Sequence, residues 1–367
     1  KIRGSHKGNA QLGHRSRPFI TMSGVFFDYW SAIWRYLVEM TSQAFPEPRK
    51  YPVEHIWHAD WSISAKSRWV AKARRNTSGW LIYAIEPVGL LNQFRQSLSQ
   101  YGRDHALWLG LDMPVGFVDH WYDGANIQDF KSLLDIIFTG KWDSFSDVCT
   151  NPDEITHHRP FYPKTARVKG SVKRGHLVDA LGVSSFDKLY RLCEGAAYHR
   201  PAACPSFWTL GANQVGKAML HGLEHLIIPG YRDGFNIWPF TGDLSTCCQQ
   251  NGVTLIETYP GEIYGWLGID EVTKSNHKSR TLAVAALIDY AVGNGIEINT
   301  AVAADIKSGF GPDEGKDDAF DALVGALGLI RIADGKHPEY LPDRPIIRKR
   351  EGWIIGMDIG SLKPRAK

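Results

Sequence analysis

The segment Ala106–Asp112 (ALWLGLD) constrains the fold more than any other part of this sequence. It is a continuous apolar run that ends in an acid, and Met113 and Pro114 close it. Continuous apolar runs of this length are typical of a central strand that is covered on both faces, as in α/β proteins. The chain has 367 residues, of which 43% are hydrophobic, so it contains enough apolar side chains for a substantial core. We therefore expect an α/β fold.

Three segments before this run have the pattern of short strands. Glu54–Asp60 ends in an acid, and Arg68–Arg75 and Gly79–Glu86 follow it, joined by the turn Asn76-Thr77-Ser78-Gly79. Leu90–Tyr101 then has apolar residues at helical spacing. This order predicts an antiparallel three-stranded meander, a helix and a buried parallel strand, which together form a mixed sheet flanked by helices.

The rest of the chain predicts a large insertion followed by a second regular region. Residues 113–205 are less regular and hold several prolines and glycines, so we expect a loop-rich insertion over the sheet edge. Beyond it, the sequence predicts these elements: helix Gln214–Ile228, strand Gly252–Thr258, helix Lys278–Val292, edge strand Gly295–Asn299 and helix Asp317–Ile332. The predicted organisation is an N-terminal extension (1–50), a main domain (51–335) with the insertion at about 113–205, and a C-terminal tail (336–367).

Carboxylates gather at the ends of the predicted elements. Asp60 and Asp112 end the first and fourth strands, where ligand sites of open α/β sheets collect. An unpaired acid at the end of an apolar strand is costly, which favours a functional role for both. Glu257 ends a later strand in the same way. Asp318 and Asp321 are three residues apart, so on a helix their Cβ atoms face the same way at about 5–6 Å.

Hard cations such as Mg²⁺ prefer oxygen ligands, and two of them about 4 Å apart can activate water and neutralise the leaving oxygen of a phosphodiester. We therefore predict a site for two Mg²⁺ or Mn²⁺ ions, held by Asp60, Asp112, Asp318 and Asp321, with Glu257 as a fifth catalytic carboxylate. Small residues around Asp321 let its helix approach the sheet closely. These residues are Ala319, Ala322, Gly325 and Ala326.

Structural explanations compete with this hypothesis at two positions. Acids in the first turn of a helix compensate the helix dipole, which explains Asp317 and Asp318 without a function. Glu257 can equally form an ion pair with an arginine or lysine. Asp321 is poorly explained in these terms, because it begins an otherwise apolar stretch.

Positive charge is local, since the formal net charge of the chain is only +3. No acid occurs between Glu154 and Asp179, and Phe161 and Tyr162 are interleaved with the basic residues of this stretch. We predict nucleic-acid contacts from Lys164, Arg167, Lys169, Lys173 and Arg174, and from Gln214 and Lys217, for which a solvated helix face is the alternative. A second basic cluster, Lys274 to Arg280, is predicted to be a solvated face.

Several motifs between Trp57 and Met357 resemble an uncharacterised family of predicted nucleases with an RNase H fold. The motifs are HADWSISAKSRWVAKA, LGLDMPVGF, FWTLGANQVGKA, IETYPGEIYGWLG, DDAFDALVGALG and EGWIIGM. The wider superfamily includes the RuvC-like Holliday-junction resolvases, and this resemblance implies an RNase H-like fold. It also implies that Asp60, Asp112 and the pair Asp318 and Asp321 are the nuclease acids. The fourth-strand acid of the resolvases is usually Glu, whereas this chain has Asp112.

Other functions remain open at this point. A non-catalytic nucleic-acid-binding module could use the same fold and the basic stretch. A phosphotransferase would need a glycine-rich phosphate loop, but no glycine follows Asp60 until Gly79. Five cysteines without CxxC spacing favour a reducing compartment, and no apolar run reaches the roughly 20 residues of a membrane helix. We expect a cytoplasmic protein without a membrane segment, of undetermined oligomeric state.

Overall fold

A seven-stranded mixed sheet forms the centre of the fold, with the strand order β5-β6-β4-β1-β2-β3-β7. The strands are β1 (His55–Asp60), β2 (Trp69–Arg75), β3 (Trp80–Pro87), β4 (Ala106–Asp112), β5 (Asn236–Ile237), β6 (Gly252–Glu257) and β7 (Ile296–Ile298). β1, β2 and β3 form an antiparallel meander, and β4 pairs parallel with β1. β6 and β5 continue the parallel part, while β7 pairs parallel with β3 at the opposite edge. The predicted α/β fold with a mixed sheet is confirmed.

The computed structural model describes residues 48–165, 171–210, 215–269 and 271–364. Residues 1–47 of the predicted N-terminal extension lie outside this part of the chain, and the described residues belong to one unit, Pro46–Lys367. Within the described ranges, no helix is long and apolar enough to cross a membrane.

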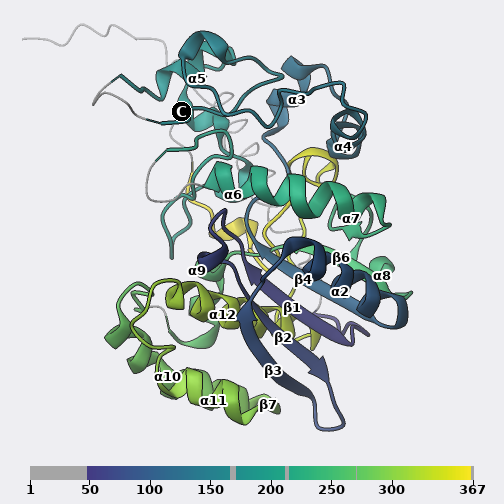
Figure 1. Ribbon diagram of the computed structural model, residues 1–367, viewed down its shortest axis with the longest axis vertical. Coiled ribbons are helices and arrows are strands. Elements are labelled where there is room, and N and C mark those ends of the chain that lie inside the picture. The colour runs from purple at the N-terminus through teal and green to yellow at the C-terminus, as the bar shows by residue number, and fades with distance from the viewer. Residues whose placement is uncertain (1–47, 166–170, 211–214, 270, 365–367) are drawn as a thin grey trace, which may run out of the picture. The chain divides into compact units, whose positions relative to one another are not determined.

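Helices cover both faces of the sheet, as the apolar run of β4 requires (Figure 1). α2 (Leu91–Asp104) buries Phe94 and Leu98 against one face, in the same hydrophobic cluster as Leu109 of β4. α12 (Lys316–Ala333) packs with Trp108 of β4 in the cluster on the other face. Adjacent residues of β4 thus point into different layers, which explains why the strand is apolar without alternation.

α12 lies close to β1 because small residues leave room for the buried ring of His58. A Cβ atom added at Gly325 would lie 2.1 Å from this ring, and one at Gly110 of β4 would lie 2.6 Å from it. The His58 ring hydrogen-bonds Thr258 Oγ1 at 2.7 Å. The predicted close approach of this helix to the sheet is confirmed, and it places the first two turns of α12 beside the ends of β1 and β4.

One long helical segment crosses a proline that was expected to stop it. α6 (Val215–Gly222) continues through a π-helical turn (η5, Leu223–Ile227) into α7 (Ile228–Arg232), which contains Pro229. The prediction that the helix ends before Pro229 is wrong. Proline lacks the N–H of a regular turn, and a π-type irregularity just before it lets the chain continue.

The insertion 113–205 packs around buried aromatic side chains that belong to the same hydrophobic cluster as the α2 face of the sheet. Its helices are α3 (Asp119–Ala125), α4 (Phe130–Phe138) and α5 (Gly175–Ala180), which Figure 1 shows beyond α6 and α7 as seen from the sheet. Phe117 stacks on Phe207 with ring centroids 5.4 Å apart, and Trp121 packs against both. This aromatic packing makes the insertion more ordered than the expected set of loops.

The segment predicted as a C-terminal tail is part of the core. Trp353, Ile354 and Met357 are buried, and the Ile355 N–H donates to the Glu257 carbonyl at 3.0 Å. Two helices flank the β7 edge, α10 (His277–Gly293) and α11 (Thr300–Lys307). The short helical segments are η1 (Ala65–Ser67), η2 (Pro152–Glu154), η3 (Phe186–Leu189), η4 (Leu192–Glu194), α8 (Leu244–Cys247), α9 (Pro260–Ile263), η6 (Tyr264–Leu267), η7 (Ile347–Glu351) and η8 (Ile359–Ser361).

Candidate metal centre

Three carboxylates meet where β1 and β4 end. Asp60 and Asp112 are direct neighbours in the parallel pairing of these strands, and Asp321 reaches them from the second turn of α12. One oxygen of each carboxylate lies within 4.8 Å of the others, and Asp60 and Asp321 are only 7% and 1% exposed. We call these three residues the acid cluster. It contains three of the four metal ligands predicted from the sequence.

Asp318, the fourth predicted ligand, lies one turn before Asp321 on α12. It is not within the 4.8 Å group, but it lines the same cavity as Asp60 and Asp112. Burial and the neighbouring Asp317 raise the pKa of Asp318 to about 6. Compensation of the helix dipole does not require an acid to be partly buried beside other carboxylates. The position of Asp318 therefore agrees with a role in the site.

A buried oxygen of the acid cluster is without a hydrogen-bond partner among the described residues. Oδ2 of Asp60 is buried and accepts no hydrogen bond from the described residues. Both oxygens of Asp321, by contrast, are engaged: Oδ1 accepts from the Tyr264 hydroxyl and Oδ2 from the Lys274 ammonium. A buried carboxylate oxygen without a partner is unfavourable, and a bound cation is the usual way to satisfy it. The Asp60 carboxylate is therefore suited to ligate a metal ion.

Burial and mutual repulsion weaken the acids of this cluster. Burial, together with Asp112 and Asp321, holds the pKa of Asp60 well above its usual range. Burial also raises the pKa of Asp112 to about 7, although the positive charge of Lys274 opposes the shift. Closely spaced carboxylates in a dry site take up either protons or a cation. The cluster has the oxygen donors and the excess negative charge that Mg²⁺ and Mn²⁺ prefer.

Lys274 was predicted to lie on a solvated face, and this is wrong. Its ammonium contacts Asp321, although 41% of the side chain remains exposed. Arg280 from the same predicted cluster is buried and donates to the carbonyls of Gly309 and Gly311 at 3.0 and 2.6 Å. No spacing in the sequence links Lys274 to Asp321, because a turn, α10 and α11 separate them along the chain.

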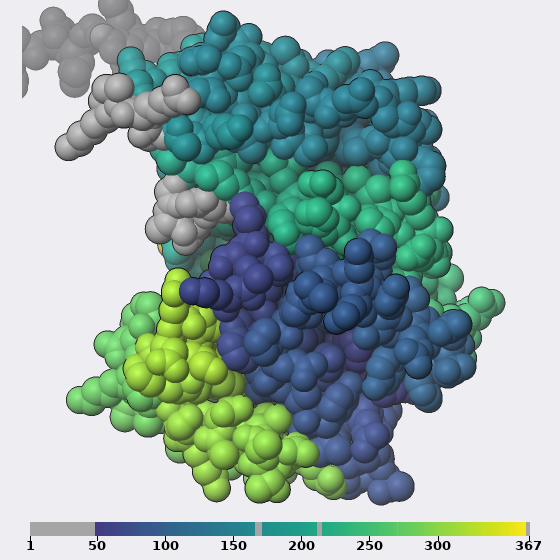
Figure 2. All heavy atoms as spheres, in the orientation of Figure 1, coloured from purple at the N-terminus to yellow at the C-terminus, as the bar shows by residue number. Residues whose placement is uncertain are grey.

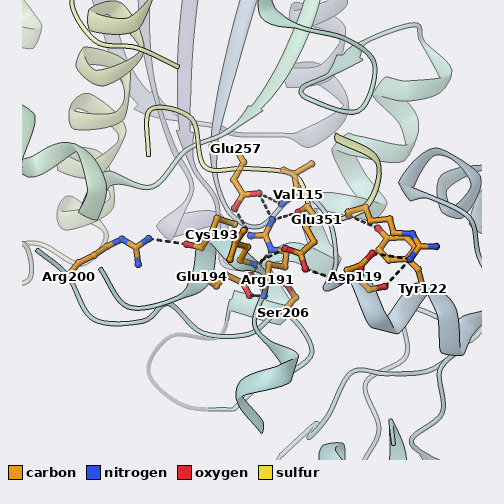
Figure 3. A network of polar contacts seen from close by, with 12 residues as sticks. Val115, Asp119, Tyr122, Arg191, Cys193, Glu194, Arg200, Ser206, Glu257 and Glu351 are labelled. Carbon is orange, nitrogen blue, oxygen red and sulfur yellow. Dashed lines mark hydrogen bonds and ion pairs between the residues drawn. The ribbon is translucent and has the colours of Figure 1, made fainter. Parts of the chain in front are cut away.

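Glu257 is held by a buried arginine (Figure 3). The Arg191 guanidinium donates to both of its oxygens at 2.6 and 2.7 Å, and the Val115 N–H donates to Oε2 at 2.7 Å. Arg191 also bonds Glu194 at 2.8 Å. A fully buried guanidinium needs such carboxylates, because losing one leaves an uncompensated charge. Of the two interpretations given for Glu257, the structure shows the ion pair, and the catalytic role of this carboxylate stays a prediction.

A cavity of about 800 Å³ gives access to the acids. Its walls come from residues 61–64 of the β1–β2 connection, residues 201–204 of the insertion, and the start of α6. Tyr259, Lys217 and Lys274 also line it. Figure 2 shows the purple β1–β2 connection meeting the green layer that contains α6. Arg68 of this connection lies 3.0 Å from the His221 ring nitrogen on α6. The acids thus lie at the base of a recess.

The predicted nucleic-acid contacts divide into three groups. Arg167, Lys169 and Gln214 lie outside the described residues. Lys164 and Lys173 are exposed, and the Arg174 guanidinium lies over the ring of Phe186 at 4.7 Å. Lys217 lines the cavity. The aromatic residues of the basic stretch, Phe161 and Tyr162, are buried in a hydrophobic cluster and are not exposed for stacking with bases.

Comparisons of the chain with known proteins give no evidence on the function of the site. No family model, no curated protein and no solved structure matches this chain. The resemblance of its motifs to an RNase H-fold nuclease family stays a prediction. Function must therefore be argued from the acid cluster and the cavity above it.

Proposed function

We propose that this protein is a divalent-metal-dependent nuclease that hydrolyses phosphodiester bonds in nucleic acid. One observation carries the proposal: three carboxylates from three separate elements converge within 4.8 Å, in a buried position, with one oxygen of Asp60 unpaired. Structural acids are normally paired with cations or hydrogen-bond donors, as Glu257 is with Arg191. The acid cluster has an excess of negative charge over its partners and faces a cavity.

The arrangement of the strands supports an RNase H-like fold for this domain. Such a core has a meander of three strands followed by parallel strands on the side of the first, and here the order β3-β2-β1-β4-β6 has this form. Asp60 ends the first strand, Asp112 ends the fourth, and Asp321 comes from the last long helix. These are the places to which the motif resemblance assigns the nuclease acids.

The chemistry follows from the donor set. Asp60 and Asp112 would hold Mg²⁺ or Mn²⁺ together with Asp321, and a bound ion would supply Lewis-acid activation of water and of a phosphoryl oxygen. Tyr264 orients the Asp321 carboxylate through its hydrogen bond. Asp318 lies on the cavity wall, where it can accept a proton from attacking water, and Lys217 is placed to bind a phosphate oxygen. No protein nucleophile is required.

The test is cleavage of labelled DNA and RNA oligonucleotides by the purified protein in Mg²⁺, Mn²⁺ and EDTA. We expect turnover with either metal, none in EDTA, and loss of turnover in Asp60→Asn. The matched control is Asp289→Asn, which removes an exposed carboxylate of α10 and should cleave at the wild-type rate.

Two results would contradict the proposal. Cleavage that persists in Asp60→Asn would mean that a contaminant or another site performs the reaction. Salt-dependent binding of oligonucleotides without metal-dependent turnover would instead favour the non-catalytic module.

A further inference from the structure

The Lys274 ammonium places a positive charge directly against the acid cluster. It contacts Oδ2 of Asp321 and is close enough to Asp60 and Asp112 for its charge to act on both. Because Tyr264 engages the other oxygen of Asp321, Lys274 and Tyr264 together use both oxygens of this carboxylate. Oδ2 of Asp60 is buried and has no hydrogen-bond partner among the described residues, so this carboxylate is available to a cation.

Hydrogen bonds with Arg280 and Ser279 hold the backbone at Lys274 and Thr273. Arg280 is 2% exposed, and its guanidinium donates to the Lys274 carbonyl. The same guanidinium also donates to the carbonyls of Gly309 and Gly311. One residue earlier, the Thr273 N–H donates to the Ser279 hydroxyl at 2.9 Å. These contacts hold the backbone from which the Lys274 side chain reaches Asp321.

The charges fit one divalent ion. The three carboxylates of the acid cluster carry three negative charges, which the ammonium and one divalent cation balance. A second divalent ion would bring excess positive charge against Lys274 and would have to displace it from Asp321. Repulsion at such separations in a buried site is strong.

We propose that Lys274 is a catalytic residue that replaces the second metal ion, so that the acid cluster binds one divalent cation. This proposal rests on the nuclease function proposed above and changes the two-ion site predicted from the sequence. The Asp60 carboxylate, whose Oδ2 has no hydrogen-bond partner among the described residues, would hold the single ion. The Lys274 ammonium then faces the cavity from the Asp321 side, where it can neutralise negative charge on the phosphoryl group as the bond to the leaving oxygen breaks.

The experiment is a titration of the metal-free full-length protein with Mn²⁺, in which electron paramagnetic resonance measures the free ion. Sites that remain in Asp60→Asn are subtracted, so that only ions of the acid cluster are counted. We expect one Mn²⁺ per chain in the wild type and two in Lys274→Met, which opens Oδ2 of Asp321. Lys278→Met, which removes an exposed lysine four residues away, should bind one.

The possible results test the role of Lys274 separately from the proposed nuclease function. Two ions in the wild type, or one in a folded Lys274→Met, overturn the role of Lys274 and leave the nuclease proposal standing. No ion in the wild type overturns both. Lys274→Arg keeps the positive charge, so it should bind one ion and retain measurable cleavage. Cleavage by Lys274→Met should instead rise with the square of the Mn²⁺ concentration at low metal.

Discussion

At the scale of single residues, the raised pKa of Asp112 makes the stability of the metal-free protein depend on pH. The folded-state pKa is about 7, mainly because of burial, whereas an unfolded aspartate titrates near 3.9. Between these values the folded state binds more protons than the unfolded state. The contribution of Asp112 to stability is thus fully present below about pH 4 and is lost as the pH rises through 7.

This linkage gives a prediction for the metal-free protein. The Tm of the wild type in EDTA should fall relative to that of Asp112→Asn between pH 5 and pH 7.5, and saturating Mn²⁺ should remove the difference in slope. Thermal denaturation of both proteins across this pH range measures the effect. Parallel pH profiles for the two proteins would show that Asp112 does not titrate in this range.

Glu257 and Asp112 end adjacent strands but should respond oppositely to neutralisation. Glu257→Gln leaves the Arg191 charge short of a partner, so we expect about 3–5 kcal/mol of destabilisation with little change in Mn²⁺ affinity. Asp112→Asn relieves repulsion and should keep or raise stability while it weakens Mn²⁺ binding. Chemical denaturation and Mn²⁺ titration of both variants compare these effects. Weak metal binding by a stable Glu257→Gln would add Glu257 to the ligand set.

The acids of the site could be predicted from the sequence, but most of their partners could not. Asp60 and Asp112 end apolar strands, and Asp321 starts the apolar part of a helix, so local patterns mark all three. Tyr264 begins the short helix η6 and Lys274 lies in the turn before α10, and the path of both segments depends on tertiary packing. Nothing local to either residue indicates that it reaches Asp321.

At the scale of elements, the contact between α12 and β1 sets the position of Asp321. Gly325 packs directly on the His58 ring one turn after this carboxylate. Gly325→Ala should cost about 1–3 kcal/mol through overpacking and should weaken Mn²⁺ binding as the helix moves outward. The control is Gly293→Ala at the end of α10, where an added Cβ meets no atom within 4 Å. Equal stability and equal Mn²⁺ affinity in the two variants would argue against this role of the contact.

Elements with strong periodicity were predicted well, and those shaped by packing were not. Ala106–Asp112 is the strand predicted from its apolar run, and β1, β2 and β3 agree with prediction to within one residue at each end. β5 has two residues and pairs with β6, so it is too short to show a strand pattern in the sequence. The helices α3 and α4 were missed because their apolar residues serve an aromatic core made by distant segments.

At the scale of the whole described unit, the insertion and the C-terminal segment are joined over the end of the sheet. Arg191 of the insertion donates to the Glu351 carbonyl at 2.8 Å as well as to Glu257. The Glu351 carboxylate accepts from the backbone N–H groups of Leu192 and Asp119 at 2.7 and 3.0 Å. This network holds one wall of the cavity against β6. It could not be predicted from the sequence, because it joins segments up to 232 residues apart.

The recessed acids predict a preference for unpaired strands. The cavity of about 800 Å³ is in the range that encloses small ligands, about 300–1,000 Å³. An unpaired strand can enter it, whereas a base-paired duplex would first have to flip out a nucleotide, which costs a few kcal/mol. We expect single-stranded oligonucleotides to be cleaved at least about 10-fold faster than blunt duplexes of the same sequence. Equal rates on both substrates would contradict a buried reaction site.

The most direct test of the central claim is a crystal structure of the protein soaked in Mn²⁺, with anomalous data collected for the metal. We predict an anomalous peak within about 2.0–2.3 Å of carboxylate oxygens of Asp60 and Asp112. Glu257 should remain bonded to Arg191 without contact to the ion. A structure with no anomalous peak at the acid cluster, or with the peak bound to Glu257 instead, would contradict the account.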